Sequence, residues 1–398
     1  MSVKNDQNLI DEFLDRGVEH VYPSRDFLES RLKKNEQLKI YLGIDPTGPT
    51  LHLGHAIVLR KLKAFQELGH KVILLIGDFT GMIGDPTDKS AARKMLTREQ
   101  VLENTKLYQE QAAKFISFTG ENAAELKYNS DWLGKMSFGD VVELAAHFTV
   151  QQMLERDMFQ ERMKEKKPIH LHEFLYPLMQ GYDSVAMDVD GEIGGNDQTF
   201  NMLAGRDLMK DMKNKEKFVI TMKLLTDPTG KKMGKSEGNM ITLLDSADEM
   251  FGKVMSWTDG MIDGGFEILT NVSSVEVEEL KKNNPNPRDQ KARLAFEVVK
   301  EFCGAEEAAK ASEGFDKMFR DKEIPEEMIN LQTVGSSVVL LDALTSAGLV
   351  SSRSEARRLI EQGGVKVDGN VIKDPFFSVQ IDSVIQKGKR SFVRVVKS

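Results

Sequence analysis

The chain has 398 residues, which is enough for two or three domains. With 40% hydrophobic and 29% charged residues, and a net charge of −8, the composition is that of a globular protein and argues against a general nucleic-acid binder. No stretch reaches the length of an apolar membrane span, the N-terminus has no signal-peptide core, and the single cysteine, Cys303, excludes an internal disulfide and a cysteine-rich zinc cluster. These features favour a cytoplasmic protein.

The first half of the chain contains a strand–helix–strand pattern. Residues up to 38 are predicted to be helical, from apolar stripes such as Phe13, Leu14 and Val18. Residues 39–44 and 71–78 are apolar throughout, as strands buried on both faces of a parallel sheet are. A helix that follows His55, with Leu59, Leu62 and Phe65 at helical spacing, connects them. The sequence therefore predicts a doubly wound α/β fold with ligands at the carboxyl ends of its strands.

The turn between the first strand and this helix is the most informative stretch. Pro46, Gly48 and Pro49 prevent regular structure before it, and His52, Gly54 and His55 stand where the helix begins. A helix N-terminus carries unpaired N–H groups and a positive dipole end, and glycine lets a ligand approach closely. The turn is therefore a candidate anion site. The alternative is that the two histidines only cap the helix.

Polar residues recur after the later strands. In the loop after the second strand, Lys89 and Arg93 are four residues apart, so one helical turn presents both to one ligand. In the segment 172–184, the spacing of Tyr176, Gln180 and Asp183 places them on one helix face. Further strands are predicted at about 192–198 and 218–225, and a basic, glycine-rich loop follows at 230–239. Each segment also has a simpler interpretation as solvated surface.

Residues 98–165 are predicted to be mainly helical, with a short strand that ends in a turn at 128–133, and Phe148, Met153 and Met158 are assigned either to the core or to an interface. Residues 246–325 are predicted to be helical with a break at 284–288, followed by a linker at 324–335. Residues 337–398 hold ten Lys or Arg against six Asp or Glu, so this tail carries +4 and the rest of the chain −12. The asymmetry indicates that the tail meets nucleic acid and the body small molecules.

The tail contains a helix followed by a hairpin. Arg353 and Arg357 share a helix face with Arg358 beside them, and Gly363 and Gly364 end that helix. Asp368-Gly369 is predicted to be the hairpin turn. Arginines on a helix surface suit phosphate contact with salt-sensitive binding. A structural cap with incidental basic residues is the alternative.

These motifs resemble known families. His52-Leu53-Gly54-His55 resembles the first signature of class I aminoacyl-tRNA synthetases, and the string Tyr-x-Gly-x-Asp-Pro-Thr from Tyr41 to Thr47 resembles bacterial-type tyrosyl-tRNA synthetases. Tyr-x3-Gln-x2-Asp, the Gly-Gly-x-Asp-Gln run and Lys232-Met-Gly-Lys235-Ser236 resemble further motifs of that family, with Gly234 where the class signature has Ser. The tail resembles the S4 RNA-binding module. Together these resemblances extend over the whole chain.

The resemblance implies a tyrosine–tRNA ligase that uses ATP with Mg²⁺, needs no zinc, and acts on L-tyrosine and tRNA as a homodimer. It implies a Rossmann-like catalytic domain at 1–245 with a dimer-interface insertion at about 130–165, a helical anticodon-arm domain at 246–330 and an S4-like domain at 337–398. His170 and His172, the remaining candidate zinc pair, have no further Cys or His nearby.

The resemblance also assigns site residues. The groups expected to stabilise charge in catalysis are His52, His55, Lys89, Arg93, Lys232, Lys235 and Ser236. The residues expected to bind tyrosine are Tyr41, Asp85, Tyr176, Gln180, Asp183 and Gln198. The residues expected to bind ATP are Gly43, Asp45, Thr47, His52, Gly54, His55, Asp197 and Lys235. RNA contact is expected from Arg353, Arg357 and Arg358. Leu42 departs from relatives with a ribose-bonding Cys, so ribose contact must depend on Asp197 and backbone.

Three other classes share parts of this pattern. A tryptophanyl-tRNA synthetase has both signatures, but an indole cannot use the donor and acceptor pair of Tyr41 and Asp183. A simple adenylyltransferase has no need of an RNA module. A non-catalytic RNA-binding relative would not need the histidine pair together with four basic residues. These are His52 and His55 with Lys89, Arg93, Lys232 and Lys235.

Overall fold

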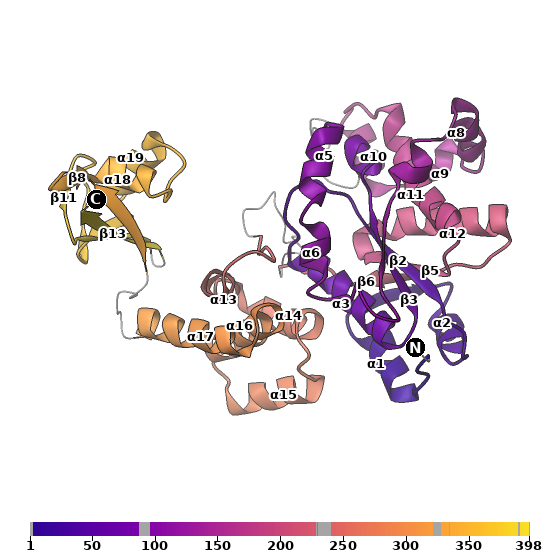
Figure 1. Cartoon of the computed structure of the whole chain (residues 1–398), viewed down its shortest axis with the longest axis horizontal. Coiled ribbons are helices and arrows are strands. Elements are labelled where there is room, and N and C mark those ends of the chain that lie inside the picture. The colour runs from indigo at the N-terminus through magenta and orange to yellow at the C-terminus, as the bar shows by residue number, and fades with distance from the viewer. Residues whose placement is uncertain are drawn as a thin grey trace. The chain divides into compact units, whose positions relative to one another are not determined.

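The computed structural model describes residues 3–86, 96–227, 229, 240–320, 328–333, 335–388 and 391–397. These residues form two compact units, 1–305 and 306–398, and Figure 1 shows the elements of each.

A six-stranded sheet forms the centre of the first unit. Its order is β1-β6-β5-β2-β3-β4, and every neighbouring pair is parallel except β1 with β6. Strand order reverses between β5 and β2, and this switch point is where doubly wound folds bind ligands. The predicted fold class is confirmed. The strands are β1 (Val18–Tyr22), β2 (Lys39–Ile44), β3 (Lys71–Ile76), β4 (Glu125–Tyr128), β5 (Gly191–Gly195) and β6 (Phe218–Met222).

Helices cover both faces of this sheet. Helix α3 (Leu53–Glu67) packs on β2, β3 and β5, and α12 (Thr199–Lys213) packs on β5 and β6. Helix α11 (Leu171–Met187) packs against α12, and Figure 1 shows α3 and α12 on opposite sides of the strands. The predicted stripe of α3, Leu59, Leu62 and Phe65, is fully buried. Burying such side chains stabilises the fold by about 1.5–3 kcal/mol each.

Two predictions in this unit are wrong in part. The first 38 residues contain α1 (Gln7–Asp15) and α2 (Arg25–Leu32), but β1 lies between them. Gly17, with a φ of +67°, ends the first helix, and pairing with β6 outweighs local helix preference. The strand expected at 128–133 already ends at Tyr128, and Ser130–Leu133 forms the short helix α7.

The predicted insertion is helical. Helices α8 (Phe138–Ala145) and α9 (Val150–Leu154) are capped by Ser137 and Thr149, whose hydroxyls accept backbone N–H groups in capping boxes. Met153 is buried in a cluster with Leu144, which gives it a core role within the chain. The other helices between β3 and α11 are α4 (Thr80–Ile83), α5 (Arg98–Thr105), α6 (Tyr108–Ala112) and α10 (Asp157–Lys164).

The remaining helices of the first unit follow β6. Helix α16 packs against α13 and α14, and its predicted apolar residues Leu294, Ala295, Val298 and Phe302 are buried. Asn286 caps α16 with Pro287 in its first turn, as the proline pair predicted. The elements are α13 (Ala247–Met255), α14 (Ile262–Leu269), α15 (Ser274–Asn283) and α16 (Pro287–Cys303), and short 3₁₀ turns occur at Asn196–Gln198 and Asp259–Met261.

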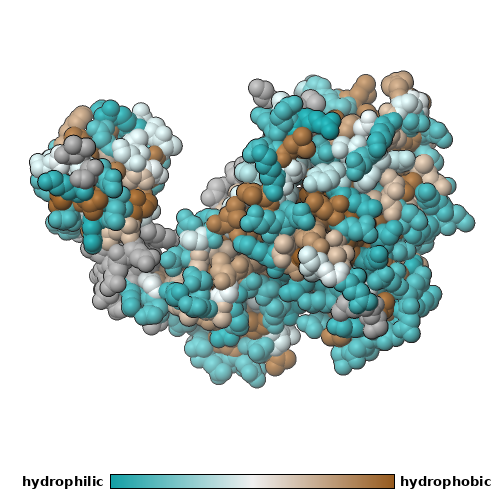
Figure 2. Space-filling model, in the orientation of Figure 1, coloured by the Kyte–Doolittle hydropathy of each residue, from teal (hydrophilic) through white to brown (hydrophobic). Residues whose placement is uncertain are grey.

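The second unit is a small α+β structure. A five-stranded sheet of order β10-β9-β12-β13-β7 and a two-stranded sheet of β11 and β8 enclose a core that includes Leu340, Leu344 and Ile360. Figure 2 shows hydrophilic and hydrophobic residues side by side on its visible face. Its elements are α17 (Ala305–Arg320), β7 (Ile329–Thr333), β8 (Ser337–Val339), α18 (Leu340–Ser346), α19 (Arg353–Glu361), β9 (Val365–Val367), β10 (Asn370–Val371), β11 (Ser378–Gln380), β12 (Val384–Lys387) and β13 (Ser391–Lys397).

Two sequence predictions concern residues of this unit. The prediction of a linker at 324–335 is wrong where β7 lies, because this strand pairs in parallel with β13. The turn Asp368-Gly369 is confirmed, because it joins β9 to β10 with φ values of +49° and +82°. Two positive φ angles are the requirement of a type I′ hairpin turn.

Candidate functional site

The histidine turn forms the N-terminus of α3. His52 is the N-cap, and its Nδ1 accepts the Gly54 N–H at 3.1 Å, while the Nδ1 of His55 accepts the His52 N–H at 3.2 Å. In a neutral ring the proton therefore lies on Nε2, which makes each Nε2 a donor. A Cβ at position 54 would lie 2.9 Å from the His52 ring, so glycine keeps that ring in place. The alternative capping role of the histidines is confirmed, and it uses the Nδ1 atom of each ring.

The chain after the predicted basic segment pairs with this turn. The Leu53 N–H donates to the Ile241 carbonyl at 3.0 Å, and the Leu243 N–H donates to the Leu51 carbonyl at 2.9 Å. The described chain resumes at Met240, directly after the predicted second signature. Lys232, Lys235 and Ser236 of that signature, like Lys89 and Arg93, lie outside the described residues.

A pocket that is partly open to solvent lies at this junction. It brings together the histidine turn, the end of β5 and the segment after the basic loop, which are far apart in sequence. Its lining residues include His52, Gly54, Gly195, Lys223 and Met240. A site built on the carboxyl ends of parallel strands is the arrangement that the fold class predicts.

Asp45 links three elements at this edge. Its Oδ2 accepts the Tyr176 hydroxyl of α11 at 2.8 Å, and its Oδ1 accepts the Thr80 hydroxyl at 2.7 Å. A Cβ at Gly77 would lie 1.9 Å from Oδ1, so only glycine fits beside this carboxyl group. Burial raises the pKa of Asp45 to about 7, although both hydrogen bonds favour the carboxylate. Gly77 and Thr80 were not predicted, because their roles depend on this tertiary contact.

Tyr41 and Asp183 are two buried residues of the predicted site. They are 0% and 2% exposed, and burial raises the pKa of each well above its usual value. Asp183 accepts the Trp132 indole N–H at 2.7 Å and the Asn129 amide at 3.3 Å. The Tyr41 hydroxyl lies 3.0 Å from the Ser184 Oγ. The sequence missed Trp132 and Asn129, whose turn after β4 gave no separate signal.

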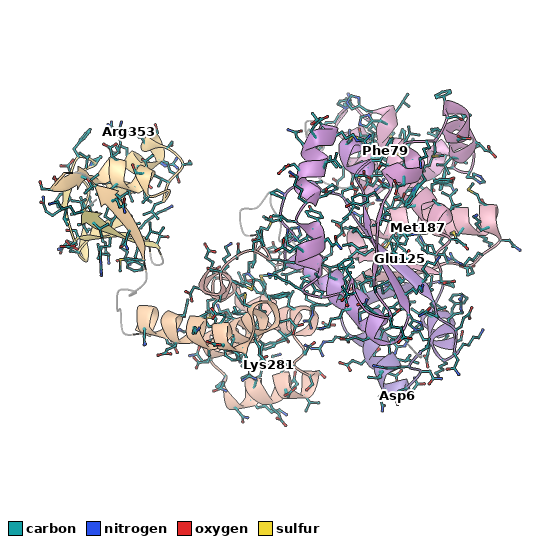
Figure 3. The ribbon with its side chains drawn as sticks, in the orientation of Figure 1. Asp6, Phe79, Glu125, Met187, Lys281 and Arg353 are labelled. Carbon is teal, nitrogen blue, oxygen red and sulfur yellow. The ribbon has the colours of Figure 1, made fainter. Side chains whose placement is uncertain are left out.

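The end of β3 positions Asn129. Its side-chain carbonyl accepts the Phe79 N–H at 2.9 Å, and its amide also donates to Thr80. Figure 3 labels Phe79, just beyond the carboxyl end of β3, and Glu125, where the neighbouring β4 begins. The carboxyl ends of these strands and the turn after β4 therefore lie at one edge of the sheet.

Two predicted residues from distant parts of the chain bond directly to each other. The Gln198 amide donates to Asp85 Oδ2 at 2.7 Å, and the Asn201 amide donates to the Gln198 carbonyl at 3.0 Å. Gln198 ends the 3₁₀ turn after β5, and Asp85 follows α4 after β3. The contact brings a carboxylate and an amide together, which suits a zwitterionic ligand.

Other predicted residues take the following positions. Gly43 is exposed within an otherwise buried stretch of β2, and Thr47 is exposed in the loop after it. The Asp197 carboxylate lies over Gly195, where a Cβ would approach its Oδ1 to 2.5 Å. Gln180 donates to Glu192 at 3.0 Å, a partner that the sequence did not suggest.

The predicted RNA-binding arginines are all exposed on α19 of the second unit, where Figure 3 labels Arg353. Arg353 pairs with Asp342 at 2.6 Å. The Arg357 guanidinium lies 5.5 Å from the centre of the Phe376 ring. These side chains are accessible to a polyanion.

The His170 and His172 rings stack 5.7 Å apart, and the described residues contain no group of three or more His, Cys, Asp or Glu arranged to hold a metal ion. Among the same residues, no helix is both long enough and apolar enough to cross a membrane.

Comparison with known proteins gives consistent matches. The family described as tRNA synthetases class I (W and Y) matches residues 33–320, and the S4 domain matches residues 340–385. A tyrosine–tRNA ligase of Thermotoga maritima is 46% identical over 391 residues, covering 96% of each chain. One of Geobacter metallireducens is 47% identical over 378 residues and 93% of each chain. A solved C-terminally truncated mitochondrial tyrosyl-tRNA synthetase of Coccidioides posadasii is 25% identical, with a TM-score of 0.63 over 77% of this chain and 92% of that one.

Proposed function

Since the chain belongs to the tRNA synthetases of class I (W and Y), we propose that it is a tyrosine–tRNA ligase. It activates L-tyrosine with ATP to tyrosyl-adenylate and pyrophosphate, and then transfers the tyrosyl group to the 3′ end of tRNA. The observation that carries the tyrosine assignment is the buried pair of Tyr41 and Asp183, polar groups that match a phenol hydroxyl. The near full-length identity to tyrosine–tRNA ligases supports it.

The first step requires no side-chain nucleophile. A carboxylate oxygen of tyrosine attacks the α-phosphorus of ATP, and pyrophosphate leaves with the electron pair of the broken P–O bond. The protein contributes positioning and charge stabilisation. The Nε2–H groups of His52 and His55 and the N-terminus of α3 supply donors to the phosphates. Lys89, Arg93, Lys232, Lys235 and Ser236 complete this role by resemblance.

Separate residues of the amino-acid pocket bind the ammonium, carboxylate and phenol groups of tyrosine. Asp85 binds the tyrosine ammonium and Gln198 its carboxylate, and their mutual hydrogen bond supports this assignment. Asp183 accepts the proton of the phenol hydroxyl, and the Tyr41 hydroxyl donates to the phenol oxygen. Tyr176 and Gln180 line the same face of α11.

ATP occupies the cavity beside the histidine turn. Gly43 and Gly54 leave room for the nucleotide, while Asp45, Thr47 and Asp197 supply polar contacts and Leu42 supplies none. Mg²⁺ enters with the ATP phosphates, since it keeps most of its waters and needs few protein ligands. The reaction proceeds without zinc.

The larger organisation belongs to the same proposal. Residues 1–245 are the catalytic domain, 246–330 the anticodon-arm domain and 337–398 the RNA-binding domain, with Arg353, Arg357 and Arg358 on tRNA phosphates. The insertion at about 130–165 forms a homodimer interface, because Phe138 and Val150 are 84% and 63% exposed there. The protein acts in the cytoplasm.

Amino-acid-dependent ATP–pyrophosphate exchange, run with all twenty amino acids, tests the proposal. Exchange with tyrosine and not with tryptophan or phenylalanine is expected. Tyr41→Phe removes one neutral hydrogen bond, which is expected to cost about 0.5–1.5 kcal/mol toward tyrosine and to reduce the preference over phenylalanine. Equal exchange with tryptophan, or an unchanged preference in the variant, would overturn the tyrosine assignment.

A further inference from the structure

A buried ion pair lies behind the tyrosine pocket, and none of the steps above uses it. Lys217 and Glu192 are 0% and 2% exposed and bond to each other. The Lys217 Nζ also donates to Ser184 Oγ at 2.8 Å and to the Met202 carbonyl at 3.1 Å. An ammonium has three donors and no acceptor, so every donor of Lys217 is used.

The surrounding backbone is shaped to hold this pair. A Cβ at Gly205 would lie 2.6 Å from the Lys217 Nζ and 2.8 Å from the Ser184 Oγ. A Cβ at Gly181 would in turn lie 3.1 Å from the Gly205 nitrogen. The two glycines thus let α11 and α12 approach closely around a charge, although burying an ion pair gives little stability by itself.

Lys217 determines which group donates and which accepts in the hydrogen bonds of Ser184 and Tyr41. Because Lys217 only donates, Ser184 Oγ accepts from it and keeps one proton of its own. Tyr41, 3.0 Å away, accepts that proton, and accepting from a cation strengthens a hydroxyl as a donor. The Tyr41 hydroxyl then keeps its own proton, for which the Gln180 carbonyl, 3.5 Å from the hydroxyl oxygen, is a distant acceptor that a closer one can replace.

The other end of the pair reaches a second residue of the pocket. Glu192 accepts the Gln180 amide at 3.0 Å, which holds Gln180 one turn of α11 from Ser184. One buried pair therefore fixes Gln180 through Glu192 and Tyr41 through Ser184.

We propose that Lys217, with Glu192 as its counterion, is a positioning residue for substrate discrimination, because it orients Ser184 so that Tyr41 donates its proton to the substrate phenol. This inference depends on the proposed function, and it adds three residues to the specificity apparatus: Lys217, Glu192 and Ser184. Phenylalanine has no oxygen to accept that proton, so an oriented Tyr41 increases the preference for tyrosine.

A double-mutant cycle on kcat/KM for tyrosine and phenylalanine in pyrophosphate exchange tests the proposal. Ser184→Ala is expected to lower the tyrosine-to-phenylalanine ratio by roughly 2- to 12-fold, the range for one neutral hydrogen bond, with the KM for ATP unchanged. In a Tyr41→Phe background the same change should have no further effect, because Ser184 acts through the hydroxyl that is already absent.

Two further variants separate positioning from folding. Lys217→Met with Glu192→Gln removes both charges and keeps an acceptor for Gln180, and it should lower the ratio as Ser184→Ala does. Thr270→Val removes a buried hydroxyl of the same unit that bonds only to nearby backbone, and it should leave the ratio unchanged.

An unchanged ratio in Ser184→Ala, or independent effects of Ser184→Ala and Tyr41→Phe, would overturn the inference. So would an unchanged ratio in the folded charge-free variant. If the wild-type protein exchanged with no amino acid, the proposed function itself would fail, which is a distinct result.

Discussion

The two units carry their polar functional groups in opposite ways. Around Asp183 in the first unit, the polar side chains are buried and bonded to one another through elements that are far apart in sequence. On α19 of the second unit, the arginines are exposed above a small apolar core. The first arrangement fixes donor and acceptor positions, as discrimination between similar amino acids requires. The second leaves charge at the surface, which suits the proposed contact with a long polyanion, because exact positions matter less there.

This difference predicts unequal costs for similar substitutions. A buried charge that loses its partner stays in a medium of low polarity, whereas an exposed charge regains water. Two ion pairs, Lys217–Glu192 and Arg353–Asp342, provide the direct comparison, since one is buried and the other is exposed.

The largest effect is expected from Lys217→Met. This change leaves Glu192 buried without its counterion and should lower the free energy of unfolding by about 3–5 kcal/mol. Urea unfolding of the full chain measures the change. The added substitution Glu192→Gln should restore most of the loss, and if the single variant proved as stable as the wild type, burial would not govern this pair.

The next effect concerns the pH dependence of stability. His70 is fully buried, and burial lowers its pKa to about 4 from an ordinary value near 6.5. Between these values the unfolded chain binds the proton and the native chain does not, so stability falls as the pH drops from 6.5 to 4, by at most about 1.4 kcal/mol per pH unit.

His70→Asn tests this assignment. The Nδ1 of His70 accepts the Leu38 N–H at 3.2 Å, and an asparagine oxygen can take over that role without titrating. The midpoint of urea unfolding, measured from pH 4 to 8, should depend less on pH in the variant below about 6.5 and equally above it. Identical slopes in both proteins would show that His70 is not the titrating group.

The sequence predicted the features that depend on interactions between neighbouring residues. It missed features that depend on contacts between residues far apart in the chain. The strands β2 and β3, the helix face of Tyr176, Gln180 and Asp183, and the Asp368-Gly369 turn depend on local spacing, and all are confirmed as elements of structure. The strand β1 was missed, because it exists through its pairing with β6.

The same reasoning applies to the candidate site. Sequence motifs indicated Asp85 and Gln198 separately, but their hydrogen bond appears only in the folded chain. Trp132, Asn129, Glu192 and Lys217 lie in no motif, and they were missed since their partners are 12 to 54 residues away. The roles of the site residues stay predictions until they are measured.

A smaller effect, on catalysis, is expected from His52→Asn. Asparagine can replace the Nδ1 acceptor that caps α3 but not the Nε2–H donor, so the helix should stay capped while adenylate formation slows at least about tenfold, or about 1.4 kcal/mol. Single-turnover formation of tyrosyl-adenylate and equilibrium binding of tyrosine are the measurements. A large loss of tyrosine affinity with an unchanged adenylation rate would place His52 at the amino acid and not at the phosphates.

The smallest effect on stability is expected from Arg353→Gln. Arg353 and Asp342 form an exposed pair in which the arginine side chain is 67% exposed, so its loss should change the free energy of unfolding by less than about 1 kcal/mol. The same change removes one proposed phosphate contact, which should lower tRNA affinity and reduce the slope of log K against log salt by about 0.7–0.9. Urea unfolding and tRNA binding at several salt concentrations measure both quantities on one variant. Asp342, the partner in this exposed pair, provides the control. Asp342→Asn breaks the same ion pair without removing a cation, so it should leave the salt slope unchanged. If Arg353→Gln destabilised the chain as much as Lys217→Met, or if both variants of the exposed pair kept the wild-type salt slope, the division between buried positioning charges and exposed binding charges would be wrong.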